Sequence, residues 1–230
     1  MSLNSKNAVE NMLAEIASEV IYTSDYIGKD RLDERVMAAM AEVPRDAFVP
    51  DDLKASAFYN GPLPIGHGQT ISQPYIVALM TDLLAAQPEH RILEVGTGSG
   101  YQAAILSRLC DKVYSMDVVP PLVASARKCL DQLGYDNIEL KSGNGYLGWP
   151  EHAPFDGIIV TAAAETIPRA LTDQLKSGGR LVIPVGPPYG YQQLKVVSKD
   201  KQNRLDTHTV LGVAFVPMVD RPADEPGSDK

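Results

Sequence analysis

ILEVGTGSGYQAA, the stretch from Ile92 to Ala104, decides the fold class of this chain. A short aliphatic run leads into three closely spaced glycines, and a helical pattern starts directly after them. Glycines at such a turn let the backbone approach a ligand closely, and a helix that starts there offers unpaired N–H groups to the same ligand. The stretch therefore predicts a strand, a ligand-binding turn and a helix, with a nucleotide-like cofactor at the turn.

Short apolar runs alternate with helical stretches from residue 91 onward, as a parallel sheet with crossover helices requires. Helices are expected to begin near Tyr101, Pro121 and Ile167, and Gly178-Gly179 is interpreted as the stop of the last one. The predicted strands of this region are Arg91–Val95, Lys112–Met116, Ile138–Lys141, Phe155–Val160 and Arg180–Val185.

Two late apolar runs have no convincing helix between them. Leu194–Ser198 and Thr207–Val216 are both predicted to be strands, and this pattern favours an antiparallel hairpin at a sheet edge. Apolar residues also recur at helical spacing in Val9–Val20 and in Arg31–Val43. We therefore expect an α/β fold: a doubly wound, Rossmann-like, mostly parallel sheet with an antiparallel C-terminal edge hairpin and extra N-terminal helices.

Length and composition favour a single domain over residues 1–230. The chain is 44% hydrophobic, which is enough for one sizeable core. Residues 1–75 are expected to supply helices and a substrate and cofactor loop, because Tyr59–Gln69 is dense in turn formers and ordered loops often bind ligands. Residues 76–218 are expected to form the Rossmann-like core. Residues 219–230 lack the apolar content to pack and are expected to be disordered.

Composition also argues against several classes of protein. The net charge of −8 speaks against binding nucleic acid through a basic field. No apolar run approaches the length of a membrane span, and no signal-peptide pattern is present. The four histidines lack metal-ligand spacing, and Cys110 and Cys129 are interpreted as reduced thiols. We expect a cytoplasmic monomer that binds no metal.

Carboxylates flank the glycine turn. Asp117 ends the second predicted strand, at the position where a carboxylate accepts hydrogen bonds from ribose hydroxyls. Glu94 lies just before the first glycine, and either carboxylate is also compatible with a solvated charge at a strand end. Gly98, Gly100 and Ala103 satisfy the looser dinucleotide fingerprint, so a nicotinamide-dependent oxidoreductase stays an alternative.

Further segments of the sequence indicate which cofactor the glycine turn binds. The most specific is LPIGHGQTISQP, from Leu63 to Pro74, and EVGTGSG follows it at Glu94–Gly100. The other segments are Glu42–Val49, Ala153–Ala163, Leu175–Leu181 and Phe215–Pro217. Taken in chain order, these segments resemble those of the protein-L-isoaspartate O-methyltransferases, and the glycine run resembles the first motif of S-adenosylmethionine-dependent methyltransferases in general. The resemblance covers nearly the whole chain outside its two ends.

The resemblance implies a repair reaction on damaged proteins and peptides. A methyl group passes from S-adenosylmethionine to the free α-carboxylate of an L-isoaspartyl residue, S-adenosylhomocysteine is released, and the ester closes to a succinimide whose hydrolysis partly restores aspartate. The family's catalytic serine corresponds to Ser72, which without the resemblance is read as a cap of the helix after Pro74. The implied cofactor-binding residues are Thr70, Ile71, Ser72, Glu94, Gly96, Thr97, Gly98, Gly100, Asp117, Asn144 and Gly145, and the implied substrate-binding residues are His67, Ala214, Val216 and Pro217.

Two positions depart from the family pattern. Asn144 stands where the family usually has Asp, and Ala214 stands where many members have a basic residue. An Asn side chain is able to meet an adenine amino group, although an ordinary Asn-Gly turn is an equally good interpretation.

The sequence can be compared with the patterns of two other functions. An adenine methyltransferase acting on nucleic acid needs Asp/Asn-Pro-Pro-Tyr after the fourth strand, where this chain has Thr161–Ala164. Pro187-Pro188-Tyr189 follows the fifth strand and is interpreted as a loop. A module that binds the cofactor without turnover is the third alternative.

Overall fold

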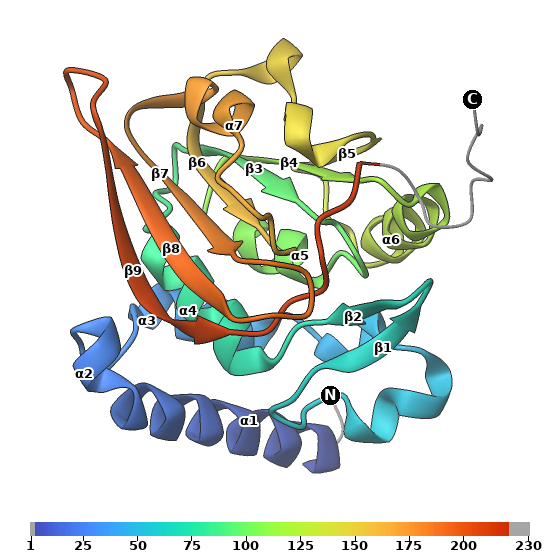
Figure 1. Cartoon of the computed structure of the whole chain (residues 1–230). Coiled ribbons are helices and arrows are strands. Elements are labelled where there is room, and N and C mark those ends of the chain that lie inside the picture. The colour runs from blue at the N-terminus through green and yellow to red at the C-terminus, as the bar shows by residue number, and fades with distance from the viewer. Residues whose placement is uncertain (1–2, 221–230) are drawn as a thin grey trace.

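A seven-stranded sheet with helices on both faces dominates the computed structural model, which describes residues 3–220, with side chains from residue 6 onward (Figure 1). The helices are α1 (Leu3–Tyr22), α2 (Ser24–Ile27), α3 (Glu34–Glu42), α4 (Pro74–Leu84), α5 (Tyr101–Ser107), α6 (Pro120–Gln132) and α7 (Arg169–Asp173). Short 3₁₀ helices are η1 (Arg45–Phe48), η2 (Asp51–Ser56), η3 (Gly145–Leu147) and η4 (Pro150–His152). The strands are β1 (Leu63–Gly66), β2 (Gln69–Ile71), β3 (Arg91–Val95), β4 (Lys112–Asp117), β5 (Ile138–Ser142), β6 (Phe155–Val160), β7 (Leu175–Val185), β8 (Gln192–Lys199) and β9 (Leu205–Val213).

The large sheet has the strand order β5-β4-β3-β6-β7-β8-β9. The first five strands of this order, β5, β4, β3, β6 and β7, pair in parallel. Strands β8 and β9 run antiparallel to their neighbours. The chain therefore winds outward from β3 in one direction and from β6 in the other, which makes the gap between β3 and β6 a topological switch point. Ligands of open α/β sheets bind outside the carboxyl ends of the strands at such a point. The predicted fold class and the edge hairpin are both confirmed.

Side chains of the central strands alternate between two cores, one on each face of the sheet. Ile92 and Val113 pack into the larger core together with side chains of α1, α3, α4, α5 and α6. Leu93 and Tyr114 point to the opposite face and pack around Trp149. Because successive strand residues face opposite sides, a strand covered on both faces needs the continuous apolar run that the sequence shows.

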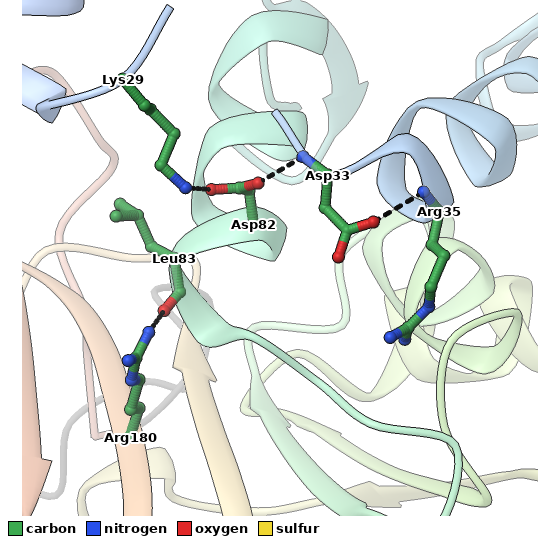
Figure 2. A network of polar contacts seen from close by, with 6 residues as sticks. All are labelled: Lys29, Asp33, Arg35, Asp82, Leu83 and Arg180. Carbon is green, nitrogen blue, oxygen red and sulfur yellow. Dashed lines mark hydrogen bonds and ion pairs between the residues drawn. The ribbon is translucent and has the colours of Figure 1, made fainter. Parts of the chain in front are cut away.

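A polar network ties the N-terminal helices to α4 (Figure 2). The buried carboxylate of Asp82, on α4, accepts hydrogen bonds from Lys29 Nζ at 2.5 Å and from the backbone N of Asp33 at 2.7 Å. One residue further along, the carbonyl of Leu83 accepts a bond of 3.2 Å from Arg180 on β7. The end of α4 is therefore fastened both to the α2–α3 link and to the sheet.

The predicted helix stop at Gly178-Gly179 is wrong. Helix α7 ends at Asp173, and β7 already begins at Leu175, so both glycines lie inside the strand. The pairing of β7 with β6 shifts register across this stretch, and Gly178 has a φ of 88°. Glycine here marks a bulge within a strand, because it adopts positive φ without strain.

Other boundaries shift by a few residues. The first helix runs from Leu3 rather than Val9, and α3 starts only after Asp33, whose side chain caps it by accepting from the N of Arg35 at 2.8 Å. Strand β9 ends at Val213, three residues before its expected end. Most of the tail that was predicted to be disordered, residues 221–230, lies outside the described residues. None of the described helices combines the length and the apolar content of a membrane-spanning segment.

Candidate cofactor and substrate site

The glycine turn between β3 and α5 lies at the switch point of the sheet. Gly96 and Gly100 have φ values of 103° and 89°, in the region that favours glycine. A Cβ on Gly96 would collide with the hydroxyl of Thr161, which follows β6 and donates a 2.7 Å bond to the Gly96 carbonyl. Ile65 of the small hairpin lies 3.4 Å from the place of a Cβ on Gly98. The turn is therefore bounded by β6 and by the hairpin, and Gly96 admits no side chain.

Asp117 lies beside this turn, at the end of β4. Its Oδ2 accepts a hydrogen bond from the N of Gly98 at 2.8 Å, and its Oδ1 accepts from the N of Val119 at 2.9 Å. Burial raises the pKa of this carboxyl, although the backbone hydrogen bonds act in the opposite direction. The carboxylate shapes the glycine turn and still has lone pairs free for a ligand hydroxyl.

Glu94 is fully buried, so the alternative of a solvated charge at the strand end is wrong. Its Oε2 accepts a 2.5 Å bond from the hydroxyl of Ser115, which also lies 2.7 Å from the hydroxyl of Thr97. Its Oε1 has no hydrogen-bond partner among the described residues. Burial raises the pKa of Glu94 to about 8, outweighing the opposite effect of Ser115, and the charge of Asp117 adds to the rise. Burial therefore favours the protonated form of this carboxyl.

Asn144 and Gly145 follow β5 at the same edge of the sheet. The Oδ1 of Asn144 accepts from the N of Tyr146 at 2.9 Å and caps η3. Gly145 lines the cavity beside the glycine turn, and a Cβ there would collide with Val95. Asn144 does not line this cavity. Its side chain caps η3, and its contact with adenine stays a prediction.

The predicted loop Tyr59–Gln69 is wrong over its second half, because Leu63–Ile71 forms a β-hairpin. Strands β1 and β2 are joined by His67, with φ of 51°, and Gly68, with φ of 69°. Two positive φ values are the mark of the tight turn that suits a two-residue hairpin. His67 is exposed at the tip and lines neither of the two cavities at the glycine turn and Ser72, so its role in substrate binding stays a prediction.

Ser72 lies between the hairpin and α4. Helix α4 starts at Pro74, its cap position is Gln73, and no side chain caps it, so the interpretation of Ser72 as a helix cap is not supported. The carbonyl of Ser72 is held by the buried Arg45, which donates from Nη2 at 2.7 Å and donates from Nε to the carbonyl of Ala57 at 2.7 Å. The backbone of Ser72 is fixed in this way, while its hydroxyl bonds to no other described residue.

Two adjoining cavities meet at these residues. The glycine-loop cavity encloses about 580 Å³ and is lined by the turn, by Asp117 and by Gly145. The serine cavity encloses about 1080 Å³ and is lined by Ser72 and Ala214 among others. Three residues line both cavities: Thr70, Thr161 and Val216. The two cavities therefore adjoin at these three residues. Ser72 also lies beside the glycine turn, because it lines a small hollow together with Gly96, Thr97 and Gly98.

The segment after β9 completes the junction. The N of Ala163 donates to the carbonyl of Val216 at 2.8 Å, and the N of Met218 donates back to the carbonyl of Ala163 at 2.8 Å. These bonds bring Val216 and Pro217 to the carboxyl end of β6, where both line the glycine-loop cavity. Sequence reasoning missed Thr161 and Arg45. Thr161 comes directly after the fourth predicted strand, and this position is the signal that could have identified it.

Solved structures share this fold. One neighbour, a protein-L-isoaspartate O-methyltransferase, superposes with a TM-score of 0.76 at 25% identity, over 90% of this chain and 67% of that one. Another, a putative protein-L-isoaspartate O-methyltransferase of Plasmodium falciparum in complex with S-adenosyl-L-homocysteine, has a TM-score of 0.74 at 25% identity, over 94% of this chain and 99% of that one. Fold and site therefore define the class of Rossmann-like methyltransferases.

Family comparison is more specific. The family described as Protein-L-isoaspartate(D-aspartate) O-methyltransferase (PCMT) matches residues 23–223, and the chain belongs to this family. A curated relative from Syntrophobacter fumaroxidans, named protein-L-isoaspartate O-methyltransferase 2, is 58% identical over 90% of this chain and 84% of its own length. A relative of the same name from a Polaromonas species is 56% identical over 90% of this chain and 98% of its own length. Membership of this family sets the oxidoreductase alternative aside.

Proposed function

We propose that this protein transfers a methyl group from S-adenosylmethionine to the free α-carboxylate of L-isoaspartyl residues in damaged proteins and peptides. The resulting ester initiates repair to aspartate through a succinimide. The observation that carries the proposal is the junction of the two cavities, with the unpartnered hydroxyl of Ser72 beside the glycine turn. The family to which the chain belongs supports the choice of substrate.

The glycine-loop cavity suits S-adenosylmethionine on the chemistry of its residues. Asp117 offers acceptors for ribose hydroxyls, and Gly96 and Gly98 of the turn line the same cavity. Glu94 does not line this cavity, but its buried Oε1 has no hydrogen-bond partner among the described residues, and an acceptor of this kind suits the ammonium group that the cofactor carries. When bound, the cofactor supplies a methyl group on a sulfonium. The residues proposed to complete this site are Thr70, Ile71, Ser72, Thr97, Gly98, Gly100, Asn144 and Gly145.

Ser72 is proposed to position the substrate rather than to remove a proton. A carboxylate with a pKa near 4 is already ionised at neutral pH, so the reaction needs no general base. The Ser72 hydroxyl donates a hydrogen bond to one carboxylate oxygen and thereby directs the other toward the cofactor cavity. Alignment of this kind supplies much of the rate enhancement, and an error of about 1 Å costs about a hundredfold. Ala214, Val216, Pro217 and His67 are proposed to contact the substrate backbone.

Several sequence predictions enter the proposal unchanged. The chain is proposed to act as one unit, with residues 1–75 contributing the substrate side and residues 76–218 the cofactor side. A monomeric state, a cytoplasmic location and the lack of nucleic-acid binding rest on the composition of the chain.

A matched pair of peptides tests the proposal. Initial rates are measured at saturating S-adenosylmethionine on an isoaspartyl peptide and on its aspartyl twin. The two free carboxylates hang at different distances from the backbone, so geometry at Ser72 is expected to favour the isoaspartyl peptide by about a hundredfold or more. Comparable rates on both peptides would overturn the repair function and leave a general carboxyl methyltransferase.

A further inference from the structure

A groove continues from the serine cavity away from the glycine turn. The serine cavity shares Gln73, Ile76, Tyr191 and Gly212 with a second hollow, which adds Glu19 and Tyr26. A third hollow shares Glu19 with the second and adds side chains of α1 and of the segment after η2. Figure 1 shows α1 and α2 lying along the same side of the molecule as the start of β8 and the end of β9. An extended chain that enters at Ser72 therefore has a continuous path over α2 and α1.

Four exposed tyrosines line this path, which we call the tyrosine groove. Their exposed fractions are 85% for Tyr22, 70% for Tyr26, 67% for Tyr59 and 73% for Tyr191. Large aromatic side chains gathered on one exposed surface mark places where proteins bind other molecules. Tyrosine suits a polypeptide ligand, because its ring covers apolar stems and its hydroxyl bonds to backbone groups.

The charge of the tyrosine groove has a single sign. Glu15 and Glu19 are the charged residues among its lining side chains, and the lining contains no Lys, Arg or His. Neither carboxylate makes a hydrogen bond or an ion pair with another described residue. A cationic side chain placed there gains attraction from the carboxylates and from the faces of the tyrosine rings. A second copy of this chain is a poor occupant, because its net charge is −8.

We propose that the tyrosine groove binds the polypeptide on one side of the isoaspartyl residue and selects segments that carry Lys or Arg. This inference rests on the proposed function and adds a substrate preference to it. Glu15, Glu19 and Tyr22 lie on α1, before residue 23, where the family match begins. Because the groove starts at the serine cavity, it is continuous with the site that takes the isoaspartyl carboxylate.

Steady-state kinetics on a set of isoaspartyl peptides test the proposal. A short peptide is compared with peptides extended on the N-terminal or the C-terminal side, each with a single Lys or a single Glu in the extension. On one side, the Lys extension is expected to have a KM about fivefold to tenfold lower than the Glu extension, with kcat unchanged. Equal KM values for Lys and Glu extensions on both sides would overturn the proposal.

Matched variants locate the effect in the groove. Glu19→Gln and Tyr26→Ala are expected to abolish most of the Lys preference while leaving kinetics on the short peptide unchanged. The controls are Glu10→Gln, on another face of α1, and Tyr189→Ala, an 89% exposed tyrosine outside the groove. Equal effects of the groove variants and the controls would contradict the assignment. A change of molar mass in sedimentation for the groove variants alone would make the groove an interface between copies and would also overturn it.

The short peptide separates this inference from the function on which it rests. Failure of the wild-type protein to methylate the short isoaspartyl peptide would refute the proposed function. Normal turnover of the short peptide without a Lys preference in the extended ones would refute the tyrosine groove alone.

Discussion

The two sides of the Ser72 junction are built in opposite ways. On the cofactor side, Glu94 and Ser115 are fully buried and Thr97 is 3% exposed, and their side chains bond to one another. On the substrate side, Thr70 is exposed and Ser72 is half-buried, and neither hydroxyl bonds to another described residue. The cofactor side is therefore organised before any ligand arrives, whereas the substrate side is left for a variable polypeptide to complete.

The first and largest test of this contrast concerns the buried carboxyl of Glu94. Its pKa is about 8 in the folded protein, against an ordinary value of 4.5. Between these values the folded state keeps a proton that the unfolded chain has lost, so the unfolding free energy falls as pH rises, by about 1.4 kcal/mol per pH unit. The stabilisation is complete below the ordinary pKa and is lost as pH rises through about 8. Urea denaturation between about pH 5.5 and about pH 8 measures this slope.

Glu94→Gln is the matched variant for this measurement. It keeps an acceptor for Ser115 and removes the titration, so its stability is expected to be nearly flat over the same range. The lowered pKa values of Asp156 and Asp200 and the raised pKa of Asp117 belong to both proteins, so the difference between the two slopes reports on Glu94. Parallel slopes for the two proteins would show that the cofactor side does not titrate as its burial implies.

Ser72→Ala tests the substrate side. The variant is expected to reduce turnover on an isoaspartyl peptide about a hundredfold, because the substrate carboxylate loses its orienting donor. Affinity for S-adenosylhomocysteine, measured by calorimetry, is expected to stay within about threefold, since Ser72 acts on the substrate. Ser72→Thr, which retains a hydroxyl, serves as the control. Equal losses of turnover and of cofactor affinity would mean that the two sides are not separate.

The same contrast explains what the sequence predicts and what it does not. Strand β3, the glycine turn and Asp117 are close in sequence, so a local pattern predicts their arrangement. The substrate side joins Ser72, Thr161 and Ala214, which come from three distant segments, and no local pattern specifies their contact. The resemblance to a family supplied Ser72 and Ala214 but did not identify Thr161 or the tyrosines of the groove.

The helix stop placed at Gly178 fails for a related reason. Because glycine readily adopts a positive φ, a glycine pair is suited both to the end of a helix and to a bulge in a strand. Only the pairing of β7 with β6 shows which of these two structures forms. The hairpin at His67 was missed for a similar reason, because the residue types of its turn are also common in irregular loops.

Asp117→Ala tests whether the organised side also holds the cofactor. The variant removes acceptors for ribose and releases the N–H groups of Gly98 and Val119 that now bond to the carboxylate. We expect S-adenosylmethionine binding to weaken by about 1.5–3 kcal/mol, the usual loss for a charged hydrogen-bond partner. Isothermal titration measures the dissociation constant. An unchanged constant would remove Asp117 from the cofactor site and leave it a purely structural residue of the turn.

The smallest expected effect belongs to Asn144→Asp, which restores the usual family residue at the edge of the cofactor side. Asp and Asn are equally good at capping a helix start, so the bond from the N of Tyr146 is expected to persist and the melting temperature to stay nearly constant. The carboxylate is a stronger acceptor for an adenine amino group, so cofactor affinity is expected to be equal or up to about fivefold tighter. Asn144→Ala is the control, because it removes the cap and is expected to cost about 1 kcal/mol of stability. A markedly looser complex in Asn144→Asp, with the fold intact, would show that adenine is held elsewhere than at the end of β5, and that the organised side of the site is smaller than its buried residues suggest.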